Sequence, residues 1–159
     1  MSPSIAKSGV PSASPTDDPT AEPTESKLDA LKAVMLPLSP NSAESLDDED
    51  SDQYRAMEWL VKNESFDSFS TEKMAQRWSL ATLYESFYGK EWKENTGWLR
   101  DRGEYSDECS WQGIVCGDLG SVTRIELKGN SLWGGLPREI GLLDDLGKFV
   151  LYFRSLIHL

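Results

Sequence analysis

Cys109 and Cys116 offer the most definite chemistry in this sequence. They are the only cysteines among the 159 residues and lie seven positions apart. A closed structural zinc site takes four ligands, and no histidine or further cysteine lies near the pair to complete one. The pair therefore predicts a disulfide, and hence an oxidising compartment. Two reduced, buried thiols are the alternative.

The remaining polar residues do not predict catalysis. His158 is the single histidine, which excludes His-based triads and metal sites with several His ligands. The chain has no GxGxxG, P-loop or HExxH motif and no kinase signature. The acidic run at residues 47–52 lacks EF-hand spacing, and Asp144 and Asp145 fall in a predicted loop where carboxylates are solvated. We therefore expect a protein that is not an enzyme and uses no cofactor and no metal.

Residues 1–52 differ in composition from the rest of the chain. They contain no aromatic residue and three Lys against eleven Asp and Glu, whereas all sixteen aromatic residues lie in residues 53–159. Such a segment buries too little apolar surface to offset its ordering entropy, so residues 1–52 are predicted to form a disordered tail. Residues 27–36 could form a short amphipathic helix there, either transient or used to dock on a partner. The net charge of −11 argues against nucleic-acid binding.

Signals for export disagree with one another. The N-terminus, MSPSIAKSGVPSAS, has no apolar run of signal-peptide length, and no stretch approaches the roughly 18 apolar residues of a membrane span. Asn63 opens an Asn-Glu-Ser pattern for N-glycosylation, which is either used after export or a chance tripeptide. The predicted disulfide favours an extracellular or cell-surface location, and the N-terminus does not show the route.

Two helices and a hairpin are predicted to position the cysteines. Residues 53–62 and 71–88 carry apolar side chains at helical spacing, with Ser70 or Thr71 as a cap and Gly89 as a stop. Their aromatic side chains are expected to form a core and not a cofactor site. Residues 114–116 and 122–127 are β-rich and are joined by Gly-Asp-Leu-Gly, which predicts a hairpin.

An internal repeat follows the hairpin. A shift of 24 residues places Ile125 onto Phe149, Leu127 onto Leu151 and Leu132 onto Leu156. A period of 20–29 residues with a Leu-x-Leu core is typical of a solenoid that presents strands on a concave binding surface. The second repeat departs from the pattern, since Arg154 stands where Asn130 would recur, and it ends within a turn.

The segment before the repeat resembles a known cap. The motif C-x-W-x-G-x-x-C spans residues 109–116, Trp92 and a Gly-Trp-Leu triplet at 97–99 precede it, and Val-Thr at 122–123 follows. Together they resemble the plant-type N-terminal cap of leucine-rich repeat proteins. The segments QYRAMEWLV and RWSLATLYESFYG look like the extended cap of algal, diatom-type members. The resemblance covers residues 53–156.

The resemblance implies the domain plan and the roles of individual residues. We expect a disordered tail at 1–52, a helical, disulfide-closed cap at 53–121, and α/β leucine-rich repeats at 122–159, the second incomplete. Strand alternation turns Arg124, Glu126 and Lys128 outward, onto the face that reads ligands in this family, although a solvated charged face is the alternative. The structural positions of the repeat are Ile125, Leu127, Asn130, Leu132, Gly135, Leu136, Pro137 and Ile140. The Leu and Ile side chains among them are expected to point inward, as are Leu143 and Leu146. Asn130 is expected to be a buried amide that satisfies backbone groups, and Gly135 and Pro137 are expected to fit a turn.

The expected function is non-catalytic recognition of a protein or peptide ligand by a receptor-like or secreted protein. The alternatives are part of the ectodomain of a receptor kinase, an inhibitor of secreted hydrolases, or a non-functional fragment. Because fewer than about three repeats rarely support themselves, the sequence also suggests a truncated product or a second repeat covered by a partner. Self-association through that repeat is then expected.

Overall fold

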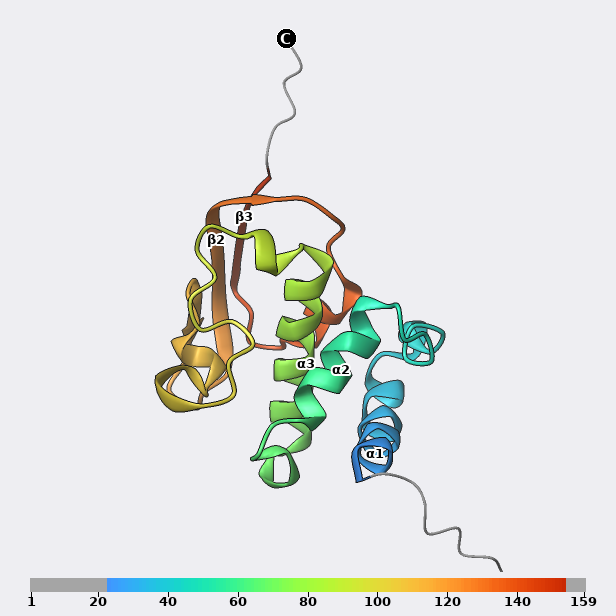
Figure 1. Ribbon diagram of the computed structural model, residues 1–159. Helices are drawn as coiled ribbons and strands as arrows, with labels where there is room; N and C mark the ends of the chain where they lie inside the picture. The colour runs from blue at the N-terminus through green and yellow to red at the C-terminus, as the bar shows by residue number, and fades with distance from the viewer. Residues whose placement is uncertain (1–22, 154–159) are drawn as a thin grey trace, which may run out of the picture.

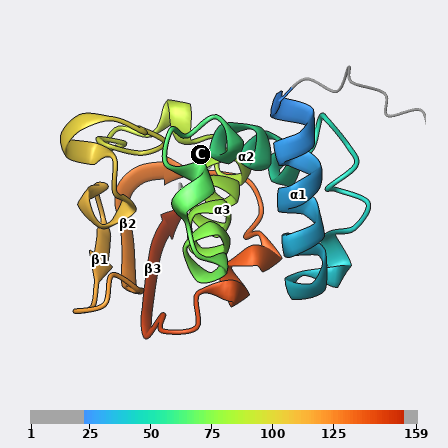
Figure 2. The same cartoon turned by 90° about the horizontal axis from the view of Figure 1, so that it is seen from below.

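The computed structural model describes residues 23–153 of the chain. These residues form three α-helices, α1 (Pro23–Leu38), α2 (Asp52–Val61) and α3 (Thr71–Ser86), followed by three strands, β1 (Ile114–Cys116), β2 (Val122–Leu132) and β3 (Lys148–Phe153). The sheet, α3, α2 and α1 lie in that order across the molecule (Figures 1 and 2). Among the helices, α3 therefore lies against the sheet.

The helix α1 shows that the predicted boundary between residues 52 and 53 is wrong. Leu31 and Met35 of α1 are fully buried, as is Leu46 beyond it, and they pack in one cluster with Met57 and Leu60 of α2. Leu31 and Met35 are four residues apart and form one apolar stripe, which the average composition of 52 residues conceals. Residues 23–52 thus pack against α2 and belong to the same helical region. Residues 1–22 of the predicted tail lie outside the described residues.

Serine side chains cap α2 and α3, and the cap of α3 is one of the two predicted residues, Ser70. Ser51 Oγ accepts a hydrogen bond from the Tyr54 N–H, and Ser70 Oγ accepts one from the Lys73 N–H. Each bond satisfies a backbone donor that has no partner inside its own helix. These caps fix where the two helices start.

The end of α3 differs from the prediction. The helix stops at Ser86, and Tyr88, not Gly89, takes the left-handed backbone conformation, with φ of 53°. Gly89 is needed for a different reason, because a Cβ atom there would lie 2.1 Å from the ring of Tyr84. The glycine makes room for an aromatic side chain of the helix it follows.

Tryptophans fill the space between α3 and the sheet, as expected for a core. Trp92, Trp98 and Trp111 are all buried, in one cluster with Leu83 of α3 and Ile125 of β2. The Trp92 and Trp98 rings meet edge to face with centroids 5.0 Å apart. The indole N–H of Trp98 donates to the Gln112 carbonyl at 2.8 Å, so its polar atom is satisfied within the core.

The sheet has the order β1-β2-β3 and is mixed. β1 and β2 form the predicted hairpin, antiparallel, with Ile114 opposite Ile125. β2 and β3 are parallel, with Ile125 opposite Phe149 and Leu127 opposite Leu151. The 24-residue shift that aligned the apolar positions in the sequence is therefore the offset of this strand pairing.

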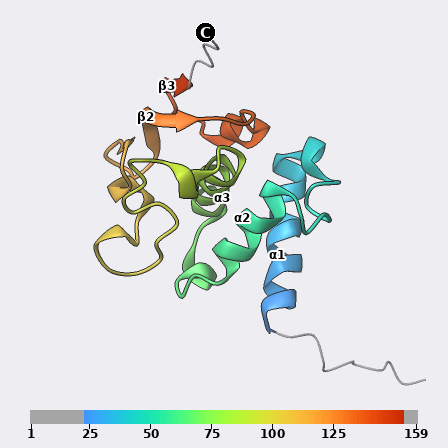
Figure 3. The same ribbon diagram turned by 45° about the horizontal axis from the view of Figure 1, so that its top comes forward.

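The connection from β2 to β3 returns across α3. Its 3-10 turn, Arg138–Leu142, lies beside that helix (Figure 3), and Ser79 Oγ of α3 donates to the Glu139 carbonyl at 2.7 Å. The Glu139 side chain is buried and accepts hydrogen bonds from Ser42 Oγ and from Gln53 Nε2. A residue of the crossover thus ties the segment after α1 to α2 and α3.

Most of the predicted inward positions of the repeat are buried. Leu136 is an exception, because its side chain is 54% exposed and the prediction that it points inward is wrong. It precedes Pro137, which begins the 3-10 turn, and the chain changes direction there. Gly135, which the sequence places in a turn, is exposed there. Of the other predicted inward positions, Leu146 is partly buried, and those that are buried are Ile125, Leu127, Leu132, Ile140 and Leu143.

Candidate functional site

The outer face of the sheet carries the three charged side chains that the sequence predicts to face outward. Ile125 and Leu127 are buried against the helices, and strand alternation turns Arg124, Glu126 and Lys128 to the opposite face. Arg124 lies beside Val115 of β1 in the strand pairing. β3 pairs with the other edge of β2, so the face is built by all three strands, with β2 in the middle.

Lys148 of β3 joins this group, and the three cations surround one carboxylate. Glu126 carboxylate oxygens lie 3.2 Å from Lys148 Nζ, 3.4 Å from Lys128 Nζ and 3.7 Å from Arg124 Nη1. The hydrogen bond from Lys148 is the main cause that holds the pKa of Glu126 below its ordinary value, and the charge of Lys128 adds to it. We call Arg124, Glu126, Lys128 and Lys148 the charge cluster.

Sequence reasoning missed Lys148, although the signal was present. The same 24-residue shift that aligns Ile125 with Phe149 places Arg124 onto Lys148, and the two residues are paired in the sheet. Parallel pairing at a constant offset stacks equivalent positions of successive strands. The outer face of the sheet thus gains the charge of Lys148, which lies 24 positions after Arg124 in the chain.

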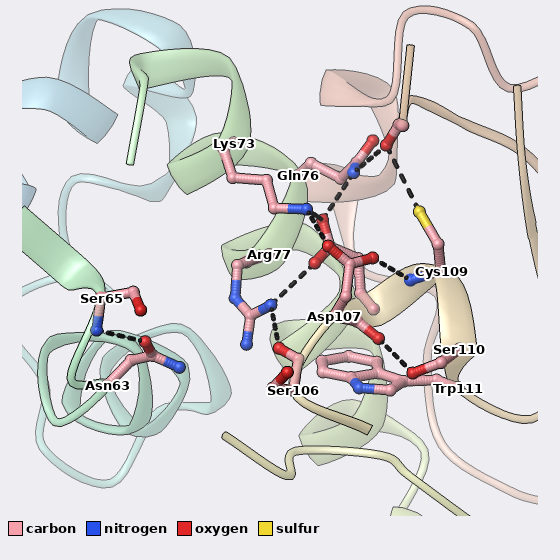
Figure 4. Close-up of polar contacts among 12 residues, drawn as sticks. Asn63, Ser65, Lys73, Gln76, Arg77, Ser106, Asp107, Cys109, Ser110 and Trp111 are labelled. Atoms are coloured by element: carbon pink, nitrogen blue, oxygen red, sulfur yellow. Dashed lines mark hydrogen bonds and ion pairs between the residues drawn. The ribbon is translucent and has the colours of Figure 1, made fainter. Parts of the chain in front are cut away.

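A buried ion pair on the other side of the sheet holds the cysteine loop to α3 (Figure 4). Arg77 Nη1 donates to Glu108 Oε2 at 2.7 Å, with Arg77 1% and Glu108 0% exposed. Lys73 Nζ lies 2.8 Å from the other Glu108 oxygen, Oε1. Gln76 Nε2 donates to that same oxygen at 2.6 Å. The Glu108 carboxylate is therefore fully partnered by three residues of one helix.

The guanidinium of Arg77 is enclosed by aromatic rings. It lies 5.1 Å from the ring centroid of Trp59, 5.2 Å from that of Phe69 and 5.6 Å from that of Trp111. Its Nε and Nη2 atoms have no hydrogen-bond partner among the described residues. The surrounding rings stabilise the positive charge by cation–π contacts instead. These contacts hold the Arg77 side chain in place and exclude solvent from it.

The predicted disulfide between Cys109 and Cys116 is confirmed. The sulfur atoms are bonded at 2.01 Å and the Cα atoms lie 5.5 Å apart. Cys109 directly follows Glu108, and Cys116 is the last residue of β1. The Asp107 carboxylate caps this turn by accepting from the Cys109 N–H, and although burial opposes it, the hydrogen bond from Lys73 holds the Asp107 pKa below its ordinary value. The disulfide therefore connects β1 to the ion pair on α3.

Two asparagines singled out by the sequence have different surroundings. Asn130 is buried as predicted, and its side chain bonds both the N–H and the carbonyl of Glu94, a residue of the loop that follows α3. Asn63 is 4% exposed, and its Oδ1 accepts from the Ser65 N–H at 2.8 Å. Glycosylation of Asn63 stays a prediction, and this burial weighs against it because an attached glycan needs open surface.

Neither a clustered metal site nor a membrane-spanning helix is found among the described residues. No group of three or more His, Cys, Asp or Glu among residues 23–153 could hold a metal ion. In the same part of the chain, no helix is both long and apolar enough to cross a membrane. His158 lies outside the described residues.

Comparison with known proteins adds no assignment. No protein-family model, no curated protein and no solved structure matches the chain.

Proposed function

We propose that this chain recognises a protein or peptide ligand, without catalysis, on the outer face of the β1-β2-β3 sheet. The observation that carries the proposal is the charge cluster, in which three strand-borne cations surround the single carboxylate of Glu126. Rigid strands hold these side chains, and the opposite face of the same strands is packed against the helices. A preorganised, solvent-accessible polar face of this kind suits ligand binding.

The charge of the cluster indicates the chemistry of the ligand. Arg124, Lys128 and Lys148 outnumber Glu126, so the cluster is net positive on a chain whose formal net charge is −11. The local positive potential attracts negative groups at short range, whereas the acidic remainder of the chain repels them. The favoured ligand is an acidic peptide segment.

The architecture proposed for this face is the beginning of a leucine-rich repeat array. Support comes from the parallel β2–β3 pairing at an offset of 24 residues and from the buried Asn130 that satisfies backbone groups. The disulfide supports an extracellular or cell-surface location, because such bonds persist in oxidising compartments.

Self-association belongs to the same proposal. β3 is an edge strand in the described sheet, and Phe149 and Leu151 are only partly buried. An unpaired edge beside apolar side chains favours pairing with another strand. Sedimentation of the full chain should show oligomers that a Val150→Lys substitution reduces, and a stable monomer at micromolar concentration would contradict this part of the proposal.

Binding of a labelled peptide tests the recognition function. A fluorescein-labelled octapeptide of alternating Glu and Val should bind the full chain, and the same peptide with Gln for Glu should bind far more weakly. The double variant Arg124→Gln/Lys148→Gln should weaken binding about tenfold, since each exposed ion pair contributes up to about 1 kcal/mol. Equal binding of the two peptides would contradict the proposal.

A matched control separates the face from the net charge. Lys90 and Lys93 are exposed, lie outside the sheet and form no ion pair within the described residues. The variant Lys90→Gln/Lys93→Gln removes the same charge and should bind the acidic peptide as the unmodified chain does. Equal weakening by the two double variants would assign the binding to overall charge and overturn the proposed site.

A further inference from the structure

A groove of about 480 Å³ opens at the start of α3. The first turns of α3 form one wall, the tip of the β1–β2 hairpin forms another, and the segment that leads into β3 forms the third. No residue of the charge cluster lines it. Whatever this groove binds therefore goes beyond the function proposed for the outer face of the sheet.

The floor and one edge of the groove are apolar. Ala75, Val122 and Leu143 are buried side chains that line it, while Leu38 at the end of α1 is partly exposed beside them. Leu119 at the hairpin tip is 98% exposed and also lines the groove. An exposed leucine next to a concave apolar floor marks a surface suited to covering by another apolar group.

The rim of the groove is negatively charged. Glu72, Asp144 and Asp145 line it, and no Lys or Arg does. Asp144 and Asp145 form no ion pair within residues 23–153. Glu72 bonds its own backbone N–H and Ser70, which holds its pKa below the ordinary value. The groove therefore combines an apolar floor with uncompensated carboxylates.

We propose that this groove binds a peptide segment of a partner protein that carries leucine-sized side chains beside Lys or Arg. The leucine side chains would cover the exposed Leu119 and Leu38 above the buried floor, and the cations would face the rim carboxylates. The volume lies in the range of about 300–1,000 Å³ that binding pockets occupy. Charge complementarity selects a basic partner over an acidic one, because like charges brought together oppose association.

Three peptides test the occupant on the isotopically labelled full chain. The probe acetyl-Gly-Lys-Leu-Leu-Lys-Gly-amide should shift the amide resonances of Leu119, Val122 and Asp144 in a saturable way. Replacing both Lys by Glu, or both Leu by Ser, should weaken binding about tenfold or more. No saturable shift at millimolar probe, or equal affinity of the three peptides, would overturn the proposal.

Surface substitutions test the place of binding. Leu119→Ser should weaken the probe about three- to tenfold, and Asp144→Asn/Asp145→Asn should do so by a similar factor. Both changes lie at exposed positions, and circular dichroism checks that each variant folds. The control Glu91→Gln/Glu104→Gln removes two exposed carboxylates that do not line the groove and should leave the affinity unchanged. Equal weakening by this control, or no effect of Leu119→Ser, would show that the groove is not the site.

Discussion

The Arg77–Glu108 pair and the charge cluster around Glu126 use the same chemistry in opposite surroundings. At most 1% of either side chain in the Arg77–Glu108 pair is exposed, whereas more than two-fifths of every cation in the charge cluster is exposed. Exposed ion pairs contribute little to stability, while breaking a buried pair leaves an uncompensated charge in the interior. The buried pair therefore fixes the cysteine loop, and the exposed cluster is left able to exchange its partners for a ligand.

Glu108→Gln tests this comparison most strongly. It keeps the size of the side chain but leaves the Arg77 charge buried among aromatic rings, so we expect a loss of about 3–5 kcal/mol in the free energy of unfolding. Denaturant titration followed by tryptophan fluorescence measures it. The same substitution at Glu126 is the matched control and should scarcely move the midpoint. Comparable losses at the two positions would mean that burial does not separate the roles of the two sites.

A second prediction tests whether α1 is part of the helical core. Leu31→Ala removes a fully buried side chain and should destabilise the protein by about 2–4 kcal/mol. Leu36→Ala, on the same helix but 40% exposed, should change stability by less than about 0.5 kcal/mol. Thermal unfolding of the two variants measures the difference. A negligible effect of Leu31→Ala would return residues 23–38 to the predicted tail.

The disulfide connects the loop of the buried ion pair to strand β1, and its removal should lower the free energy of unfolding by an intermediate amount. For a loop this short, the loss of chain constraint in Cys109→Ser/Cys116→Ser corresponds to about 2–3 kcal/mol. We also expect weaker binding of the acidic peptide, because β1 would no longer be held to α3 beside the charge cluster. Unfolding and peptide titration of the same variant measure both effects. Lost stability with unchanged binding would show that the outer face is positioned without the bridge.

Local patterns predicted much of the sheet and little of the buried ion pair. Ile125, Leu127 and the Cys109–Cys116 bridge could be predicted because strand alternation, the 24-residue shift and the scarcity of cysteines are visible within short stretches. Arg77 and Glu108 lie 31 residues apart and follow no periodic pattern. Their contact depends on where α3 and the cysteine loop meet in space, which spacing along the chain does not encode.

The errors have equally specific causes. A short amphipathic helix at residues 27–36 was predicted, but its place in the core was missed, because the burial of Leu31 and Met35 depends on packing against α2. Leu136 was predicted to point inward by periodicity, but the turn before Pro137 breaks that periodicity. Periodic reasoning holds along a strand or helix and fails at the points where the chain changes direction.

The smallest expected effect concerns the titration of Glu126. Its pKa in the folded chain lies below the ordinary value of 4.5, chiefly because of the hydrogen bond from Lys148. The stabilisation that this cluster supplies is therefore fully present above that ordinary value and is lost as the pH falls through the folded-state pKa. Lys148→Gln should raise the Glu126 pKa toward 4.5, as measured by carboxyl carbon resonances, while Lys90→Gln should leave it unchanged. If Lys148→Gln leaves the titration where it was, Lys128 and Arg124 hold the carboxylate by themselves. The outer face would then be organised by β2 alone, and the parallel strand would add charge to the ligand face without shaping it.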